Sequence, residues 1–343
     1  MVRFGLGQFT LQIPPWDTRD AAQLYADTLT LAKTAEGAGF SSFWLAEHHG
    51  ASDSYNPSLL PFLSAVAAST TTIEVGTAVM LAPFHDPLRI AEDAAVVDNI
   101  SGGRLNLGLG LGWALHEYKM FGAESKGRGK RLEEFVEVLR LAWSGEPFSF
   151  DGKHLSYDQV MVRPTPARPI PIWLGGGTPP ALERAARMAD GHFPPSTGSP
   201  GQGVDRAREI KEIRTRLGLS GSYRYGMFLP TGVGKNADDG WQRIRDGLLH
   251  VRGAYALWGQ GVTDVTNARD TAGQWEDAVR GGALCGSPQE IVDVLAPHVA
   301  ELDGMGFDDV FISVILAPPG TPLDAAAESV ETFGSQVIAA LAG

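Results

Sequence analysis

The feature that most constrains the fold of this chain is a regular alternation of short apolar runs with longer amphipathic segments. Runs such as Val310–Leu316 suit strands that are buried on both faces. Strands alternating with helices favour a parallel sheet with right-handed crossovers. About eight strands within 343 residues predict a closed (β/α)8 TIM barrel with insertions, in one domain that spans 1–343. The expected strands are Arg3–Phe9, Ser42–Ala46, Ile73–Met80, Arg104–Gly110, Ile170–Gly175, Gly191–Pro194, Tyr223–Leu229 and Asp308–Ile315.

Several expected helices begin with a capping residue followed by proline, the pair that favours a first helical turn. These pairs are Asn56-Pro57, Asp86-Pro87, Thr178-Pro179 and Ser287-Pro288. Ser287 and Glu290 also have the spacing of a capping box.

Two segments depart from the simple repeat. The first, 143–171, is rich in Pro, Gly, Phe and Tyr and predicts a short antiparallel insertion. The second, 232–286, is a long insertion before the last helix. Because loops at the carboxyl end of a barrel carry function, part of it is expected to form a mobile lid. A helical elaboration packed on the outside is an equal alternative.

Composition excludes several classes of protein. The net charge of −12 argues against nucleic-acid binding, because phosphates are attracted by a basic surface. The single cysteine, Cys285, rules out an internal disulfide. No apolar stretch approaches the ~18 residues that span a bilayer, and the first residues lack a signal-peptide pattern. We expect a cytoplasmic protein that binds neither nucleic acid nor membranes.

Glu47-His48-His49 directly follow the apolar run Phe43–Ala46. In a barrel they lie at the carboxyl end of a strand, where barrel active sites lie. Histidine is an acid or base near neutral pH, and a neighbouring carboxylate can orient it. Hydrogen bonding in a turn is an equally simple role. Adjacent residues of an extended strand point to opposite faces, which argues against a metal centre here, so none is expected.

Two glycine-rich stretches stand at the ends of later strands. In Arg104–Trp113 the glycines alternate along a strand, which marks close approach of another group to the backbone, such as a flat aromatic ring system near Gly110. In Pro171–Pro180 a strand is followed by Gly175-Gly176-Gly177 and a helix that begins at Thr178. Helix N-termini of this kind bind phosphate, although a flexible turn would look the same.

Together these stretches resemble the bacterial-luciferase-like family of flavin-dependent oxidoreductases. The resemblance extends over nearly the whole chain, and its most specific segments are Trp44–His49, Ile73–Val79, His85-Asp86-Pro87, Asp98–Arg104, Glu117-Tyr118, Pro171–Gly177 and Gly286–Glu290. It implies a barrel that binds reduced flavin mononucleotide (FMN) at its carboxyl end, with His48 as the catalytic histidine beside Glu47. It also implies a cis peptide at Ala78-Val79 beneath the flavin ring and the phosphate at Gly176, Gly177 and Thr178. Phe9, Met80, Trp113 and Phe193 are expected to line the pocket.

The function that this resemblance favours is a two-component monooxygenase. Reduced FMN from a separate NAD(P)H flavin reductase would react with O₂ and oxidise a small, apolar organic substrate. One departure questions the cofactor: Leu111 stands where luciferase has an arginine beside the flavin phosphate, and Gly112-Trp113 resembles enzymes that use a deazaflavin coenzyme. A deazaflavin-dependent hydride-transfer enzyme is therefore the main alternative. A flavin-binding protein without turnover and a metal-dependent hydrolase using His48 and His49 are two others.

Family members commonly pair as dimers through helices near the second and third strands. In this chain these are the alanine-rich segments after Asn56 and after Asp86, whose small residues allow close helix packing. We expect a homodimer. The alternative is that these alanines only pack against the barrel.

Overall fold

A computed structural model describes residues 1–195 and 198–341. Its eight principal strands pair in parallel around a closed ring, and register such as Val2 opposite Val310 joins the last strand to the first. The expected (β/α)8 barrel is confirmed. In ring order the strands are β1 (Val2–Phe9), β2 (Ser42–Leu45), β3 (Glu74–Thr77), β5 (Leu105–Gly110), β8 (Ile172–Gly175), β9 (Gly191–Phe193), β10 (Arg224–Val233) and β12 (Val310–Ile315).

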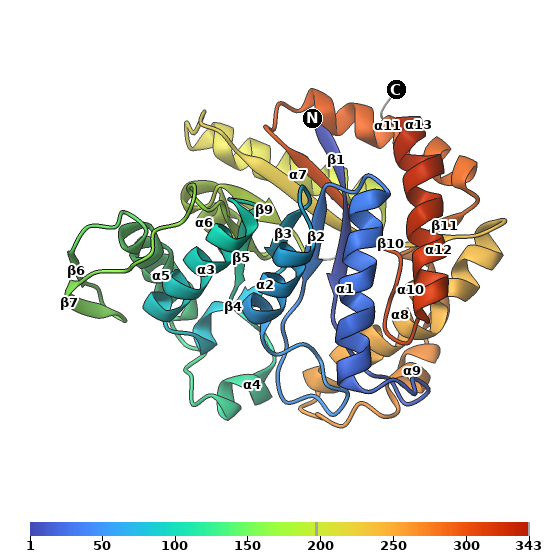
Figure 1. Cartoon of the computed structure of the whole chain (residues 1–343), viewed down its shortest axis with the longest axis horizontal. Helices are drawn as coiled ribbons and strands as arrows, with labels where there is room; N and C mark the ends of the chain where they lie inside the picture. The colour runs from blue at the N-terminus through green and yellow to red at the C-terminus, as the bar shows by residue number, and fades with distance from the viewer. Residues whose placement is uncertain (196–197, 342–343) are drawn as a thin grey trace.

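Helices surround the strands and bury apolar side chains against them (Figure 1). They are α1 (Ala21–Gly37), α2 (Leu59–Ser69), α3 (Pro87–Ser101), α5 (Arg128–Ala142), α6 (Pro179–Met188), α7 (Pro200–Arg216), α8 (Ala237–Gly259), α11 (Pro288–Gly304) and α12 (Leu323–Thr332). None of the described helices is both long and apolar enough to cross a membrane.

The predicted helix starts are confirmed at α3, α6 and α11, and α11 begins with the full capping box of Ser287 and Glu290. The start at Asn56-Pro57 is wrong by two residues, because Ser58 is the capping position of α2. Asn56 is held in the preceding loop instead: its backbone N–H donates to the Thr10 carbonyl at 2.8 Å, and its own carbonyl accepts from His48.

The two expected insertions contain additional short elements. Segment 143–171 holds the antiparallel pair β6 (Phe148–Asp151) and β7 (Ser156–Val160), which projects from the barrel in Figure 1. Segment 232–286 holds α8, α9 (Ala268–Gly273), α10 (Glu276–Gly281) and β11 (Leu284–Gly286). The remaining elements are β4 (Met80–Leu81), the 3₁₀ turn η1 (Ala82–Phe84), α4 (Leu115–Met120), the π-helical turn η2 (Phe333–Ile338) and α13 (Ala339–Leu341).

Aromatic rings fill the inside of the barrel. Trp44, Trp173, Phe193, Phe228 and Phe311 form one buried cluster, in which Trp173 and Phe193 stack with ring centroids 4.6 Å apart. Glycines on neighbouring strands leave room for these rings, since a side chain in their place would collide with them. The barrel is thus a packed core and not a pore, as its type requires.

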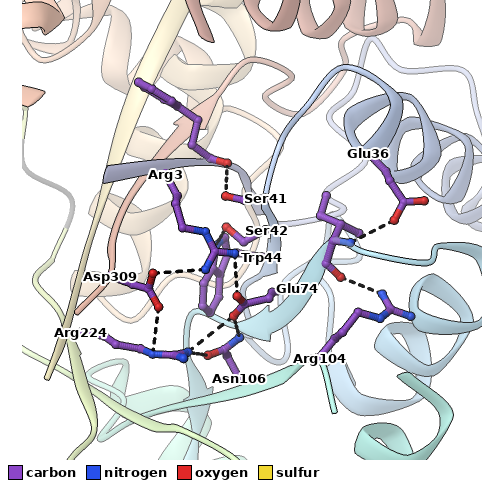
Figure 2. A network of polar contacts seen from close by, with 12 residues as sticks. Arg3, Glu36, Ser41, Ser42, Trp44, Glu74, Arg104, Asn106, Arg224 and Asp309 are labelled. Atoms are coloured by element: carbon purple, nitrogen blue, oxygen red, sulfur yellow. Dashed lines mark hydrogen bonds and ion pairs between the residues drawn. The ribbon is translucent and has the colours of Figure 1, made fainter. Parts of the chain in front are cut away.

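A polar network lies at the amino ends of the strands (Figure 2). The Glu74 carboxylate accepts from Arg3 at 2.7 Å and from the Asn106 amide at 2.7 Å, while Arg224 lies 3.6 Å away. Asp309 lies 3.4 Å from both arginines. Two cations and two anions therefore balance within this cluster, which packs below the aromatic core.

Candidate active site

His48 lies just beyond the carboxyl end of β2 and is oriented by a carboxylate from another loop. Its Nδ1 lies 2.8 Å from Oε1 of Glu117, on the short helix α4 that follows β5. The same oxygen accepts the backbone N–H of His49 at 2.9 Å. Glu117 is completely buried, and so is most of His48. The imidazole is therefore fixed by a carboxylate held at two points.

This contact also sets which nitrogen of His48 is available for chemistry. A carboxylate oxygen only accepts, so Nδ1 carries the hydrogen in the contact with Glu117. In neutral His48 the lone pair then resides on Nε2, on the other side of the ring. A histidine held in one tautomer by a carboxylate is suited to take a proton from a bound substrate and to be stabilised as the cation.

Aromatic side chains surround the His48 ring. Ring centroids of Trp258, Tyr55, Tyr255 and Trp113 lie 4.8, 4.9, 5.3 and 6.0 Å from that of His48. The hydroxyls of Tyr55 and Tyr255 are 3.0 Å apart, and burial raises the pKa of both phenols, so both remain neutral. Tyr255 and Trp258 belong to α8, so the first helix of segment 232–286 contributes directly to the surroundings of His48.

The Glu47 carboxylate binds two histidines other than His48. Its Oε1 accepts from Nε2 of His49 at 2.8 Å and from Nε2 of His85 at 2.9 Å. Burial alone would raise the pKa of Glu47, but the bonds from both histidines outweigh it and lower the pKa, so Glu47 is ionised. The geometry gives Glu47 a positioning role, and direct participation of Glu47 in catalysis stays a prediction.

The residues expected beneath a flavin ring are brought together. Ala78-Val79 is a cis peptide, as the family resemblance implies. Val79 packs against three strand glycines: a side chain on Gly110 would lie 2.5 Å from it, and one on Gly108 or Gly175 would lie 3.4 Å away. The group that approaches Gly110 in this structure is therefore Val79 itself. Met80, expected to line the pocket, is buried in the main hydrophobic core with Phe9.

The turn from β8 into α6 carries the glycines predicted to bind phosphate. Gly176 has φ +125°, a conformation that L side chains rarely adopt, and a side chain there would also meet Ala181. Thr178 is the capping residue, yet its side chain makes no capping hydrogen bond. The first turn of α6 offers no free donor, because its first two residues are prolines and the N–H groups of Ala181 and Leu182 both donate to the Thr178 carbonyl, at 2.9 and 3.0 Å. The helix therefore does not supply the expected donors, and the N–H groups that remain for an anion at this turn are those of Gly176, Gly177 and Thr178.

Two arginines of α6 do not replace the arginine that is missing at Leu111, because both pair with a carboxylate on α5. Arg184 and Arg187 lie 3.2 and 3.9 Å from Oε1 of Glu133 on α5. Arg128, at the start of α5, instead donates to the carbonyl of Gly112 at 3.1 Å. A cation thus reaches the loop that carries Leu111, although sequence reasoning did not single it out.

Sequence reasoning also missed the partner of His48. Glu117 lies 69 residues further along the chain. In the sequence it stands within a family-like segment, Glu117-Tyr118, that by itself indicates no role. The signal that was available is its position: a carboxylate in the loop that follows a barrel strand, where side chains from other strand ends converge.

Barrel topology and a histidine–carboxylate pair at the carboxyl ends of the strands define an oxidoreductase of the luciferase-like type. The model of the luciferase-like monooxygenase family matches residues 7–308, and the chain belongs to this family. Two curated relatives are F420-dependent glucose-6-phosphate dehydrogenases. The one from Nakamurella multipartita is 31% identical over 65% of this chain and 68% of its own length. The one from Kineococcus radiotolerans is 32% identical over 56% of this chain and 58% of its own length.

A solved structure with the same fold is the monooxygenase RslO1 from Streptomyces bottropensis. It superposes with a TM-score of 0.79 at 24% sequence identity and covers 98% of this chain and 99% of its own. At this level of identity the likeness supports the fold alone.

Proposed function

We propose that this protein is a deazaflavin-dependent oxidoreductase that uses coenzyme F420 to accept a hydride from an alcohol carbon or to return one to the corresponding carbonyl carbon. The observation that carries the proposal is the buried pair of His48 Nδ1 and Glu117 Oε1 at 2.8 Å, because oxidation of an alcohol requires a base for its hydroxyl proton. The two F420-dependent relatives, with Leu111 and Gly112-Trp113 in this chain, favour this cofactor over FMN.

The described residues fit a bound cofactor and substrate. Oε2 of Glu117 and Nε1 of Trp258 are buried and have no partner within the described part of the chain, so polar groups of a ligand can satisfy them. The turn at Gly176 offers backbone N–H groups to the cofactor phosphate. The half-buried side chain of Val79 supplies an apolar surface for a ring.

In the proposed mechanism each residue has one task. The bound deazaflavin supplies a hydride acceptor. Nε2 of His48 takes the hydroxyl proton of the substrate, and Glu117 holds the ring and stabilises the positive charge that develops on it. Tyr55, Tyr255 and Trp258 keep water from this face of His48. In the reverse direction His48 returns the proton to a carbonyl oxygen.

The proposal is tested first by binding and then by turnover. The protein without cofactor is titrated with F420 and with FMN, and F420 should bind at least ten-fold more tightly. Loss of F420 absorbance is then followed with glucose 6-phosphate and with 2-propanol. His48→Ala should reduce turnover at least 100-fold and leave the F420 Kd within about two-fold. His298→Ala, on α11, is the matched control. Tighter binding of FMN would contradict the proposal.

A monooxygenase that uses reduced FMN and O₂ is the second candidate, because the matched family model describes monooxygenases and the Gly176 turn suits the FMN phosphate equally well. A separate NAD(P)H flavin reductase would then supply reduced flavin. Substrate-dependent oxygen consumption in the presence of such a reductase would favour this candidate. A flavin-binding protein without turnover would bind cofactor and show neither activity.

The homodimer also remains a proposal. On α3, one of the two helices expected at the interface, Val96 and Ile100 are 43% and 47% exposed. Exposed apolar side chains on one helix can be buried against the same helix of a second copy. Light scattering of wild-type protein and of the double variant Val96→Asp, Ile100→Asp would show whether this face joins two chains.

A further inference from the structure

A compact group of three side chains lies next to the proposed active site but outside the His48–Glu117 pair. Glu47, His49 and His85 offer one carboxylate oxygen and two imidazole nitrogens, all within 4.8 Å of one another. We propose that these residues form a binding site for one divalent transition-metal ion of the zinc type. The site would be separate from the organic cofactor, and its occupancy would stabilise the loops that hold it.

The chain places these ligands on one side for a simple reason. Glu47 and His49 are two residues apart on extended chain, so both point to the same face, while His48 between them points away to Glu117. The argument from adjacent residues therefore excludes a shared ion for His48 and His49 but not for Glu47 and His49. His85 completes the set at the end of the turn η1, which follows β4.

The two histidines engage only one of the two carboxylate oxygens of Glu47. Both Nε2 atoms lie at 2.8 and 2.9 Å from the same oxygen, Oε1. The other oxygen, Oε2, is buried and has no partner within the described part of the chain. Both donors thus bind one oxygen, and the lone pairs of the other oxygen have no partner. A cation at the centre of the group would use these lone pairs.

The donor set and its surroundings suit zinc. Two imidazoles and one carboxylate are the ligands of many zinc sites that keep a fourth position for water. Tetrahedral bonds of about 2.0 Å place ligand atoms roughly 3.3 Å apart, so each nitrogen needs to move away from Oε1 by about 0.5 Å. The two nitrogens, which lie within 4.8 Å of each other, need to reach the same separation. Phe121 and Phe84 pack on His49, with ring centroids 4.7 and 5.8 Å away, and His85 is partly exposed, which provides a route of entry.

The experiment uses untagged protein freed of metal with a chelator and then titrated with Co²⁺, whose visible absorption reports its coordination. We expect one equivalent to bind with the intense bands of a four-coordinate site, and Zn²⁺ to displace it and raise the Tm by several degrees. His85→Ala and, independently, Glu47→Gln should each lower Co²⁺ affinity at least 100-fold. His298→Ala should bind Co²⁺ like the wild type.

Three results would overturn the proposal: no stoichiometric Co²⁺ binding, six-coordinate spectra only, or unchanged affinity in both His85→Ala and Glu47→Gln. Circular dichroism of each variant shows whether it is folded, and the two variants remove ligands from different loops. The F420 titration described above is independent of this site, so failure of one proposal leaves the other unaffected.

Discussion

Replacing Glu74 by glutamine tests whether the polar network at the amino ends of the strands stabilises the barrel. Glutamine has nearly the same shape but lacks the charge. The network holds two arginines and two carboxylates, so the substitution leaves Arg3 and Arg224 with Asp309 as the single anion among them (Figure 2). Glu74 is mostly buried, so water compensates little for the lost charge.

The hydrogen bonds give the size of the effect. Oδ1 of Asn106 accepts from both Trp173 and Arg224, which fixes its amide so that its NH₂ group faces Glu74. A glutamine at 74 can present its oxygen either to Arg3 or to Asn106, and its own NH₂ then faces the other donor. One buried donor is left unsatisfied, which costs about 1–3 kcal/mol. With the loss of a buried charge partner we expect about 3 kcal/mol in total.

The free energy of unfolding is measured by urea denaturation, with Tm as a second readout that should fall by roughly 5 °C. Glu92→Gln is the matched control, because Glu92 pairs with Arg89 at an exposed position where the same change should cost less than ~0.5 kcal/mol. Equal effects of the two substitutions would refute the reasoning, since burial and the fixed amide of Asn106 would then make no difference.

Three other predictions concern single residues. Glu117→Gln keeps an acceptor for His48 but removes the charge, so kcat should fall about 10–100-fold at unchanged F420 affinity; equal kcat would contradict the role of Glu117. Gly176→Ala places a side chain at φ +125° and should raise the cofactor Kd at least ten-fold, whereas Gly37→Ala should not. For Glu36, burial is outweighed by N–H groups of Thr72, Ile73 and Thr71, which lower its pKa to about 2. Its contribution, about 1 kcal/mol after solvent screening, is present above pH 4.5 and lost as pH falls toward 2, so urea unfolding of Glu36→Gln and wild type should converge there.

The fold could be predicted from the sequence because its signals are local. Each barrel strand is a short apolar run, and Asp86-Pro87 and Ser287-Pro288 specify helix starts through capping within one turn. The wrong start at Asn56-Pro57 shows the limit of such signals. There the backbone of Asn56 forms hydrogen bonds with Thr10, which is distant in sequence, and with His48, which belongs to the candidate site. These contacts outweigh the local preference for a helix.

In the candidate site, too, local signals predicted some residues, and contacts between distant segments determined the others. Position at the end of an apolar strand was enough to single out His48, but not to choose between Glu47 and Glu117 as its partner. Alternation of side chains along extended chain already directs Glu47 and His49 to one face and His48 to the other. Only closure of the barrel brings Glu117, from the loop after β5, to the face that His48 occupies. The motif Glu47-His48-His49 is therefore two sites in one sequence: a histidine directed at the proposed substrate, and a carboxylate with a histidine directed at His85.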